Sequence, residues 1–377
     1  MMSENKMDFI NPSLIIRHKK GGAVLLELKK LLKTLTDVSG VSGHEYEAAQ
    51  VVVKNIEPFS DEVNIDKMGN AIALKRGDQI GEDRKKILLA AHLDEIGLMV
   101  TKIEDGGFLR ITSVGGTDVT ILPGQAVTIL GKEQLKGVVG AKPPHLQEPG
   151  ESGKPIQMDD LYVDTGRKKE ELLDIVEIGT LVRIESEFTE LNSGCVSAMA
   201  MDDRAGVAVL VETLRRLKER KHEWDVYAIA TAQEELSGLG AITTAFHIQP
   251  DVAIAIDVTF GDGPGMPERR VSPLGKGPAI GLGPNFHPKI TQKLRDLASE
   301  YEITHQVEFS PYPGGTDAYS LQVSREGIPA GLVSIPLRNM HSTVETLKLD
   351  DVKRCAELLS IFISRLDSKF QEELKCF

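Results

Sequence analysis

Four short apolar runs constrain the fold of this chain more than any other feature of its sequence. Each run is rich in Val, Ile or Ala, which is typical of strands that are covered on both faces. The runs lie at Lys86–Asp94, Asp225–Ala232, Asp251–Val258 and Ile328–Pro336. Segments with helical periodicity lie beside them, at Asp203–Lys218, His287–Tyr301 and Asp350–Phe370. Strands that alternate with helices predict a layered α/β fold.

The N-terminal part of the chain adds further helical signals. Residues 1–22 are expected to form a loosely ordered extension, and Leu25–Leu35 alternates apolar residues and Lys at helical spacing. Ser42 and Glu45 have the spacing of a capping box, in which each side chain bonds the backbone N–H of the other residue. This pattern predicts a helix from about Glu45 to Ile56.

The stretch from Ile96 to Val196 differs from the rest of the chain. Short β-rich pieces are punctuated there by Gly and Pro, and helical periodicity is confined to Arg167–Leu173. The pattern predicts a small all-β domain, residues 96–196, inserted into a main domain formed by residues 23–95 and 197–377. The alternative is a long decorated loop, although an unstructured connection of this length is uncommon.

Composition and charge exclude several kinds of partner and site for this chain. The chain carries 44 Lys and Arg against 56 Asp and Glu, a net charge of −12, so nucleic acid is not an expected partner. No apolar run approaches the roughly 20 residues of a membrane span. The three cysteines, Cys195, Cys355 and Cys376, lack CxxC spacing, which argues against a disulfide scaffold and a thiolate zinc site. We expect a cytoplasmic protein.

Polar side chains stand where the apolar runs end. In open α/β sheets ligands bind outside the carboxyl ends of the strands, so these positions are candidates for a site. The first run ends in His92 and Asp94, which strand alternation places on one side. Asp94 can then accept the second ring N–H of His92, as metal-bound histidines require. A His-x-Asp pair also occurs in purely structural roles.

The other runs contribute carboxylates and a second histidine. Glu234 and Glu235 directly follow the second run, where packing does not readily explain two adjacent carboxylates; capping of a following helix is the alternative. Asp257 lies within the third run, and His341 follows the fourth. Asp202 precedes a helix that it could simply cap.

Together these positions supply ligands for metal ions. The expected ligands are His92, Asp202, Glu235, Asp257 and His341. Carboxylate and imidazole groups without thiolate suit Zn²⁺, Co²⁺ or Mn²⁺. One bridging carboxylate would create two three-ligand sites, and two ions about 3.5–4 Å apart can activate a water molecule and polarise a carbonyl. Glu234 is then free to accept a proton from that water and to return it to a leaving amine.

The motifs around these residues resemble those of the tetrahedral aminopeptidases, the glutamyl or deblocking aminopeptidase family, some members of which carry an endoglucanase label. The motifs are AHLDEIGLMV, AMDDRAGV, TAQEELSGLGA, AIDVTFGDGPG, PGGTDA and NMHSTVET. The resemblance covers nearly the whole chain from about Leu25 onward. It implies a three-layer α/β/α sandwich metallopeptidase domain with an inserted β-barrel-like, PDZ-like dimerisation domain. It also implies a hollow tetrahedral homododecamer built from dimers.

The resemblance also implies a role for each candidate residue. One ion would be bound by His92 and Asp257 and the other by Glu235 and His341, with Asp202 as the bridge. Glu234 would be the general base, and Asp94 would orient the histidine that precedes it in the same motif.

Four hypotheses follow from the sequence. The leading one is a co-catalytic metal aminopeptidase that removes N-terminal residues from peptides. A dinuclear deacylase or carboxypeptidase would use the same metals on another substrate. A glycosidase would need a separated carboxylate pair and aromatic platforms, and the chain has one Trp, Trp224. A metal-bound scaffold would have no need for the free base Glu234. The preferred N-terminal residue depends on loops such as Pro311–Ser320, whose shape the sequence leaves open.

Overall fold

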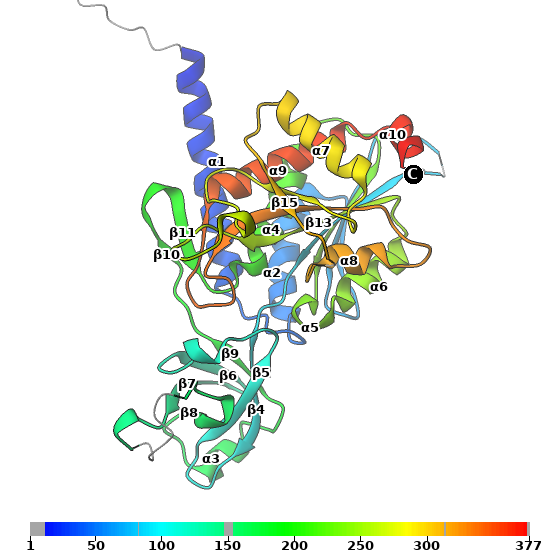
Figure 1. The fold of residues 1–377 in the computed structure, drawn as a ribbon. Coiled ribbons are helices and arrows are strands. Elements are labelled where there is room, and N and C mark those ends of the chain that lie inside the picture. The colour runs from blue at the N-terminus through cyan, green and yellow to red at the C-terminus, as the bar shows by residue number, and fades with distance from the viewer. Residues whose placement is uncertain (1–11, 82, 147–153, 313, 375–377) are drawn as a thin grey trace, which may run out of the picture.

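The fold is taken from a computed structural model that describes residues 12–81, 83–146, 154–312 and 314–374. A main domain is built on a large mixed sheet, and a smaller barrel lies at one end of it (Figure 1). Helix α1 (Pro12–Thr36) projects from the main domain on the side opposite the barrel. Within the described ranges, every helix is too short or too polar to cross a bilayer.

The large sheet has a parallel centre and antiparallel edges. The central strands, in spatial order, are β12 (Asp225–Thr231), β3 (Lys86–His92), β13 (Val252–Phe260) and β16 (Ala330–Arg338). They confirm the four strands predicted from the apolar runs. One edge is formed by β2 (Ala71–Lys75) and β1 (Glu62–Ile65), and the other by β17 (Glu345–Lys348), β11 (Cys195–Ala198) and β10 (Thr189–Glu190). β14 (Ala279–Leu282) pairs with β16 and with β15 (Gln306–Phe309). The carboxyl ends of the central strands therefore meet at one edge of the sheet.

Helices cover both faces of this sheet. One face carries α1, α2 (Tyr46–Ile56), α4 (Met201–Leu217), α7 (Pro288–Glu300) and α9 (Leu349–Ser364), and the other carries α6 (Leu239–Ile248) and α8 (Asp317–Gln322). Along β3, Ile87 and Leu89 pack in the core under the first set, whereas Leu88 and Ala90 pack in the core under the second. Burial of both faces explains why the runs show no polar alternation. The three-layer α/β/α sandwich is confirmed.

The inserted segment folds as a closed antiparallel barrel. Its strands follow one another around the barrel as β4 (Gly97–Ile103), β5 (Leu109–Val114), β8 (Leu161–Asp164), β7 (Gln134–Ala141), β6 (Ala126–Leu130) and β9 (Leu181–Ile184). The short helix α3 (Lys169–Leu173) packs against β4. Leu98, Val127 and Val182 belong to a core of the barrel's own. The predicted insert, residues 96–196, extends beyond the barrel. Its last residues form β10 and the start of β11, which pair in the large sheet.

Two helix predictions differ from the structure in their bounds. α1 begins at Pro12, so residues 12–22, expected in a loose extension, are helical; residues 1–11 lie outside the described residues. The helix predicted over Asp350–Phe370 is two helices, α9 and α10 (Ser368–Glu373), because Asp367 caps the second by accepting the backbone N–H of Phe370.

Short 3₁₀ turns lie at Glu57–Phe59, Val119–Ile121, Pro144–Leu146, Met158–Asp160, Asn192–Gly194 and Glu268–Arg270.

The capping box predicted from Ser42 and Glu45 is wrong, although the helix that follows it is right. Neither side chain caps α2. The Ser42 hydroxyl donates instead to Asp94, and the Glu45 carboxylate accepts the backbone N–H groups of Gly43 and Gln233. These side chains therefore tie the start of α2 to the loops that follow β3 and β12.

Candidate metal centre

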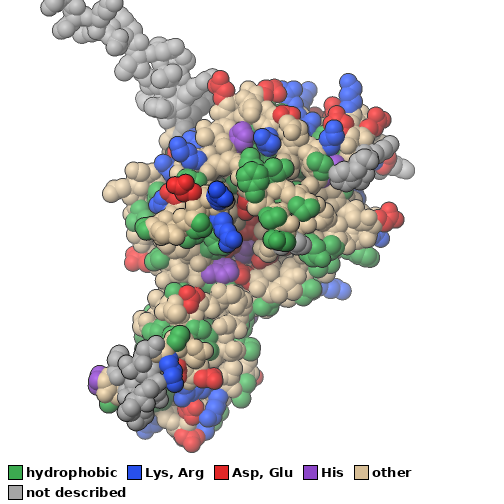
Figure 2. All heavy atoms as spheres, in the orientation of Figure 1, with side chains coloured by type: hydrophobic (Ala, Val, Ile, Leu, Met, Phe, Trp, Pro, Cys, Tyr) green, Lys and Arg blue, Asp and Glu red, His purple; other side chains and the backbone are tan. Residues whose placement is uncertain are grey.

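The central strands bring the expected ligands to one edge of the large sheet. His92 is the last residue of β3, and Asp257 lies near the end of β13. Glu234 and Glu235 begin α5 (Glu234–Ser237), just after β12, and His341 lies in the turn after β16. All of them line one cavity of about 630 Å³, together with Asp202. Figure 2 shows acidic and histidine side chains in the hollow of the main domain beside the barrel.

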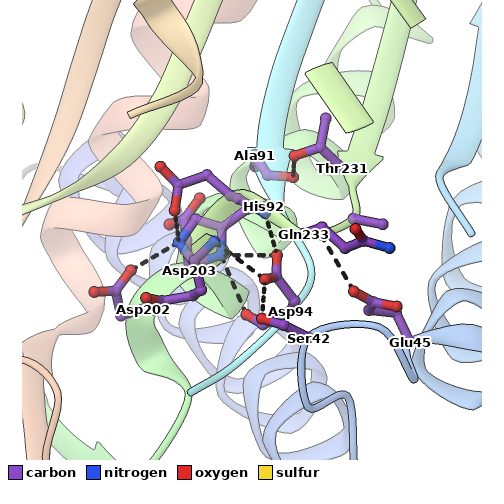
Figure 3. Close-up of polar contacts among 12 residues, drawn as sticks. Ser42, Glu45, Ala91, His92, Asp94, Asp202, Asp203, Thr231 and Gln233 are labelled. Atoms are coloured by element: carbon purple, nitrogen blue, oxygen red, sulfur yellow. Dashed lines mark hydrogen bonds and ion pairs between the residues drawn. The ribbon is translucent and has the colours of Figure 1, made fainter. Parts of the chain in front are cut away.

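The carboxylate of Asp202 lies between the two histidines. Its Oδ1 is 2.9 Å from Nε2 of His92, and its Oδ2 is 3.4 Å from Nε2 of His341. The same Nε2 of His341 lies 3.4 Å from Oε1 of Glu235. Each oxygen of Asp202 therefore faces a different imidazole, as is expected of a bridging carboxylate. Figure 3 shows the contact with His92. Asp202 stands at the start of α4, but its side chain makes no cap for that helix.

Asp94 holds the turn that carries the two glutamates. Its Oδ1 accepts the backbone N–H of Glu234 at 2.9 Å, and its Oδ2 accepts that of Glu235 at 3.2 Å and also the Ser42 hydroxyl (Figure 3). Nδ1 of His92 is 3.1 Å from the Asp94 carbonyl oxygen and 3.6 Å from its Oδ1. The backbone carbonyl is thus the nearer partner of the histidine, and the carboxylate of Asp94 mainly fixes the glutamate turn.

A third acidic residue, Asp203, joins the cluster. Ligand atoms of His92, Asp203 and Asp257 lie within 4.8 Å of one another. Oδ1 of Asp203 accepts the backbone N–H of Gly206, whereas its Oδ2 is buried without a partner in the described part of the chain. The sequence pattern places Asp203 only at the start of the predicted helix Asp203–Lys218. Its position next to Asp202 in the AMDDRAGV motif is the one signal that could have identified it.

Two further buried carboxylates support the site from outside the expected set. Glu345 accepts the backbone N–H of Asp202 at 3.1 Å and that of His341 at 2.8 Å. Asp317 accepts the hydroxyl of Thr231 at the end of β12. Both lie in motifs of the resemblance, NMHSTVET and PGGTDA, but the sequence gives no reason to assign them a role.

Burial of the site disfavours the ionised form of its acidic groups and therefore acts to raise their pKa values. Desolvation raises the pKa of Glu234 to about 8, although the charge of His92 acts in the other direction. Desolvation likewise raises the pKa of Asp257 well above its usual range. Hydrogen bonds to two carboxylates raise the pKa of His341 to about 11, although burial opposes this. Without metal ions, the cluster therefore retains protons that ligands must lose.

The donor set fits divalent cations. Oxygen and nitrogen ligand atoms of His92, Asp202 and Glu235 lie within 4.8 Å of one another, as do those of the group containing Asp257. Carboxylates outnumber imidazoles in this buried cluster, and such an excess of negative charge is stable only if it is neutralised. Divalent ions would supply the positive charge that neutralises the cluster.

The comparisons with known proteins agree with this fold. Residues 69–358 match the model of the M42 glutamyl aminopeptidase family. A lysyl aminopeptidase of Pyrococcus furiosus is 39% identical over 342 residues, which covers 89% of this chain and 97% of that protein. The structure of an aminopeptidase from the archaeon Desulfurococcus kamchatkensis is 35% identical, with a TM-score of 0.87 over 94% of this chain and 99% of that chain.

Two other solved structures are described by an assembly and by a different enzyme name. The Pyrococcus horikoshii TET1 peptidase, which can assemble into a tetrahedron or a large octahedral shell, is 33% identical, with a TM-score of 0.78 over 90% of this chain and 100% of that chain. A Thermotoga maritima protein called an endoglucanase is 32% identical, with a TM-score of 0.73 over 91% of this chain and 99% of that chain. The match extends over most of the chain, in sequence and in fold: this chain belongs to the M42 glutamyl aminopeptidase family and is a metallopeptidase of the aminopeptidase type.

Proposed function

We propose that the chain hydrolyses N-terminal residues from peptides with two divalent ions, Zn²⁺ or Co²⁺ and alternatively Mn²⁺. The proposed ligands are His92 and Asp257 for one ion, Glu235 and His341 for the other, and Asp202 as the bridge. The observation that carries the proposal is the position of Asp202, whose two oxygens face the two imidazoles. When bound, such a pair of ions polarises a carbonyl group and lowers the pKa of a water molecule.

Glu234 is the general base of this proposal. Its Oε2 lies 4.0 Å from Nε2 of His92, and it belongs to neither group of converging ligand atoms. Desolvation raises its pKa to about 8 in the metal-free site, and a carboxylate that lies beside the ions without binding them is placed to accept a proton and to return it. Its backbone is fixed by Asp94, so the carboxylate can take the proton of the attacking water and pass it to the leaving amine.

The acidic cavity also supports recognition of a free N-terminus. Carboxylates form their strongest hydrogen bonds with charged donors such as an α-ammonium group. A peptide with a free N-terminus would therefore be trimmed one residue at a time, whereas its N-acetylated form would resist. Neither alternative reaction has an observation in its favour: Trp224 is buried in the core, where no sugar can stack on it, and a deacylase would not need a site for the ammonium group.

We further propose that the barrel mediates dimerisation and that dimers assemble into a tetrahedral homododecamer. The barrel contains none of the proposed ligands, and it exposes Val138, Leu173 and Ile178, as an association surface does. A relative from Pyrococcus horikoshii can assemble into a tetrahedron or a large octahedral shell. Light scattering tests the assembly: a single species near 41.2 kDa would exclude the shell.

We also propose a cytoplasmic location. The thiols of Cys195 and Cys355 are free, as is usual in a reducing compartment.

Replacement of Glu234 by Gln tests the catalytic part of the proposal. The variant keeps the shape of the side chain and removes the proton acceptor, so kcat should fall roughly 100-fold or more while elemental analysis still finds both ions. Asp202→Ala should instead lose metal, and Glu187→Gln, an exposed site, should behave as wild type. A Glu234→Gln variant as active as wild type would refute the base assignment.

A further inference from the structure

One carboxylate in the cavity has no part in the proposed reaction. Glu308 lies on β15 and lines the cavity wall beside Phe260 and Tyr319. Its Oε1 accepts the hydroxyl of Thr259 at 2.9 Å, and its Oε2 accepts the hydroxyl of Ser334 at 2.6 Å. The side chain is half-buried. Two hydroxyl donors therefore hold it in place at the surface of the cavity.

These two hydroxyls fix the distance of Glu308 from the metal centre. Thr259 lies two residues beyond Asp257 on β13, on the same side of the strand and about 6.6 Å further along it. Ser334 on β16 is the register partner of Asp257. The Glu308 carboxylate therefore lies about one strand repeat from a proposed ligand. A substrate residue whose α-amino and carbonyl groups lie at the metal centre can reach it with a long side chain.

The charge of Glu308 has no counter-ion among the described residues. Its hydrogen-bond partners are the neutral hydroxyls of Thr259 and Ser334, and desolvation raises its pKa above the usual range. A carboxylate removed from water in this way is stabilised most by a cation that enters the same space. Phe260 and Met340 also line the cavity, and such apolar walls suit the methylene stem of a long cationic side chain.

We propose that Glu308 determines specificity by accepting hydrogen bonds from a cationic N-terminal side chain, that of Lys or Arg. The inference rests on the proposed aminopeptidase function and adds to it the class of residue that is removed. The four-carbon stem of Lys places its ammonium group away from the α-carbon, where Glu308 lies. An apolar residue leaves this carboxylate unpaired, and an acidic residue is repelled by it.

Matched aminoacyl anilides test this proposal with the metal-loaded full-length protein. Norleucine resembles Lys without the ammonium group, so the ratio of kcat/KM for lysyl over norleucyl substrate isolates the charge. We expect a ratio of roughly 10 to 100 in the wild type, a similar preference for arginyl substrate, and the slowest reaction with glutamyl substrate. Glu308→Gln should bring the lysyl ratio close to one, mainly by lowering kcat/KM for the lysyl substrate. Glu300→Gln, an exposed site on α7, is the matched control and should keep the wild-type ratio.

Each outcome bears on one of the two proposals. A wild-type ratio near one, or an equal loss of all substrates in Glu308→Gln, would overturn the specificity role and leave the aminopeptidase proposal standing. A metal-loaded wild type that hydrolyses none of the substrates would refute the proposed function instead. Product inhibition of the wild type needs no variant: free lysine should inhibit roughly 10-fold or more better than norleucine, and equal inhibition would contradict the role of Glu308.

Discussion

Nδ1 of His341 lies 3.1 Å from the carbonyl oxygen of Gly116, so a loop of the barrel contacts a proposed metal ligand of the main domain. Donation from Nδ1 to this carbonyl directs Nε2 toward Asp202 and Glu235, and Nε2 would bind the ion once it has lost its own proton. The loop is held by Thr117, whose hydroxyl donates to the carbonyl of Gly97 at 3.0 Å. The barrel therefore contributes to the orientation of one proposed ligand.

Substitution of Gly116 by Ala should weaken metal binding. An added Cβ would lie 2.8 Å from Nδ1 and 2.9 Å from Cε1 of His341, so the imidazole has to move. We expect the affinity for the more weakly held ion to fall about 10- to 100-fold, as measured by competition with a chromogenic chelator. In the control, Gly263→Ala, the nearest atom to the new Cβ is Cγ of Met266 at 3.6 Å. Unchanged affinity in Gly116→Ala would show that the barrel does not position His341.

Substitution of Asp94 by Asn should impair catalysis through the glutamate turn. The carboxylate accepts two backbone N–H groups and the Ser42 hydroxyl, and an amide offers one acceptor oxygen in place of two. We expect kcat to fall about 10- to 100-fold, with a smaller fall in Ser42→Ala, which removes one donor and leaves the carboxylate in place. Steady-state kinetics with one aminoacyl substrate compares the variants. If Ser42→Ala were the more damaged enzyme, the turn would not depend on Asp94.

Metal binding to metal-free protein should release protons at pH 7. The pKa of His341 is raised to about 11, chiefly by hydrogen bonds to Asp202 and Glu235, so this imidazole is protonated at neutral pH. A ligand histidine must be neutral, and the proton is therefore lost when the ion binds. Calorimetry in buffers of different ionisation enthalpy measures this release, and apparent affinity should rise with pH up to that pKa. Binding without proton release at pH 7 would contradict the protonated state of His341.

The pair formed by Asp225 and Arg84 should stabilise the fold above about pH 4. Burial opposes the charge of Asp225, but its hydrogen bonds with Arg84 and with the backbone N–H of Gly77 outweigh this and lower its pKa. A carboxylate with a lowered pKa stabilises the folded state above its unfolded pKa of about 3.9, and this stabilisation is lost as the pH falls through the folded value. Asp225→Asn should therefore reduce the free energy of unfolding by about 2 kcal/mol at pH 7.

Denaturant unfolding at two pH values checks this stability prediction. The difference between wild type and Asp225→Asn should shrink at pH 3, because the unfolded wild-type chain is then protonated at Asp225. Asp83→Asn is the control, because Asp83 is 93% exposed and pairs only with Lys85 among the described residues, and exposed pairs contribute little. A difference that persists unchanged at pH 3 would assign the effect to packing and not to charge.

The sequence predicts the fold well where a residue pattern has one physical cause. Runs such as Lys86–Asp94 are apolar because both faces are covered, and the structure confirms them as central strands. The capping box at Ser42 was wrong because its polar side chains found partners far away in the sequence, Asp94 and Gln233. Local spacing cannot report such partners, since it describes only what neighbours in the chain could do.

The candidate site could likewise be predicted from the sequence only in part. The position of His92 and Asp257 at strand ends could be read from the sequence, because parallel strands end at one edge of a sheet. The roles of Glu345 and Gly116 could not be read from the sequence. Glu345 accepts the backbone N–H groups of Asp202 and His341, and Gly116 contacts His341 through its backbone carbonyl oxygen. Neither contact depends on a side-chain pattern that a sequence displays.

Metal titration of the metal-free protein tests the central claim, that converging carboxylates and imidazoles hold two ions that hydrolysis requires. Activity on an aminoacyl substrate should be absent without metal and should rise with added Zn²⁺ or Co²⁺ until about two equivalents per chain are bound. Asp202→Ala, which lacks the proposed bridge between His92 and His341, should bind fewer ions and remain inactive. Full activity in wild-type protein shown to be metal-free by elemental analysis would contradict the account.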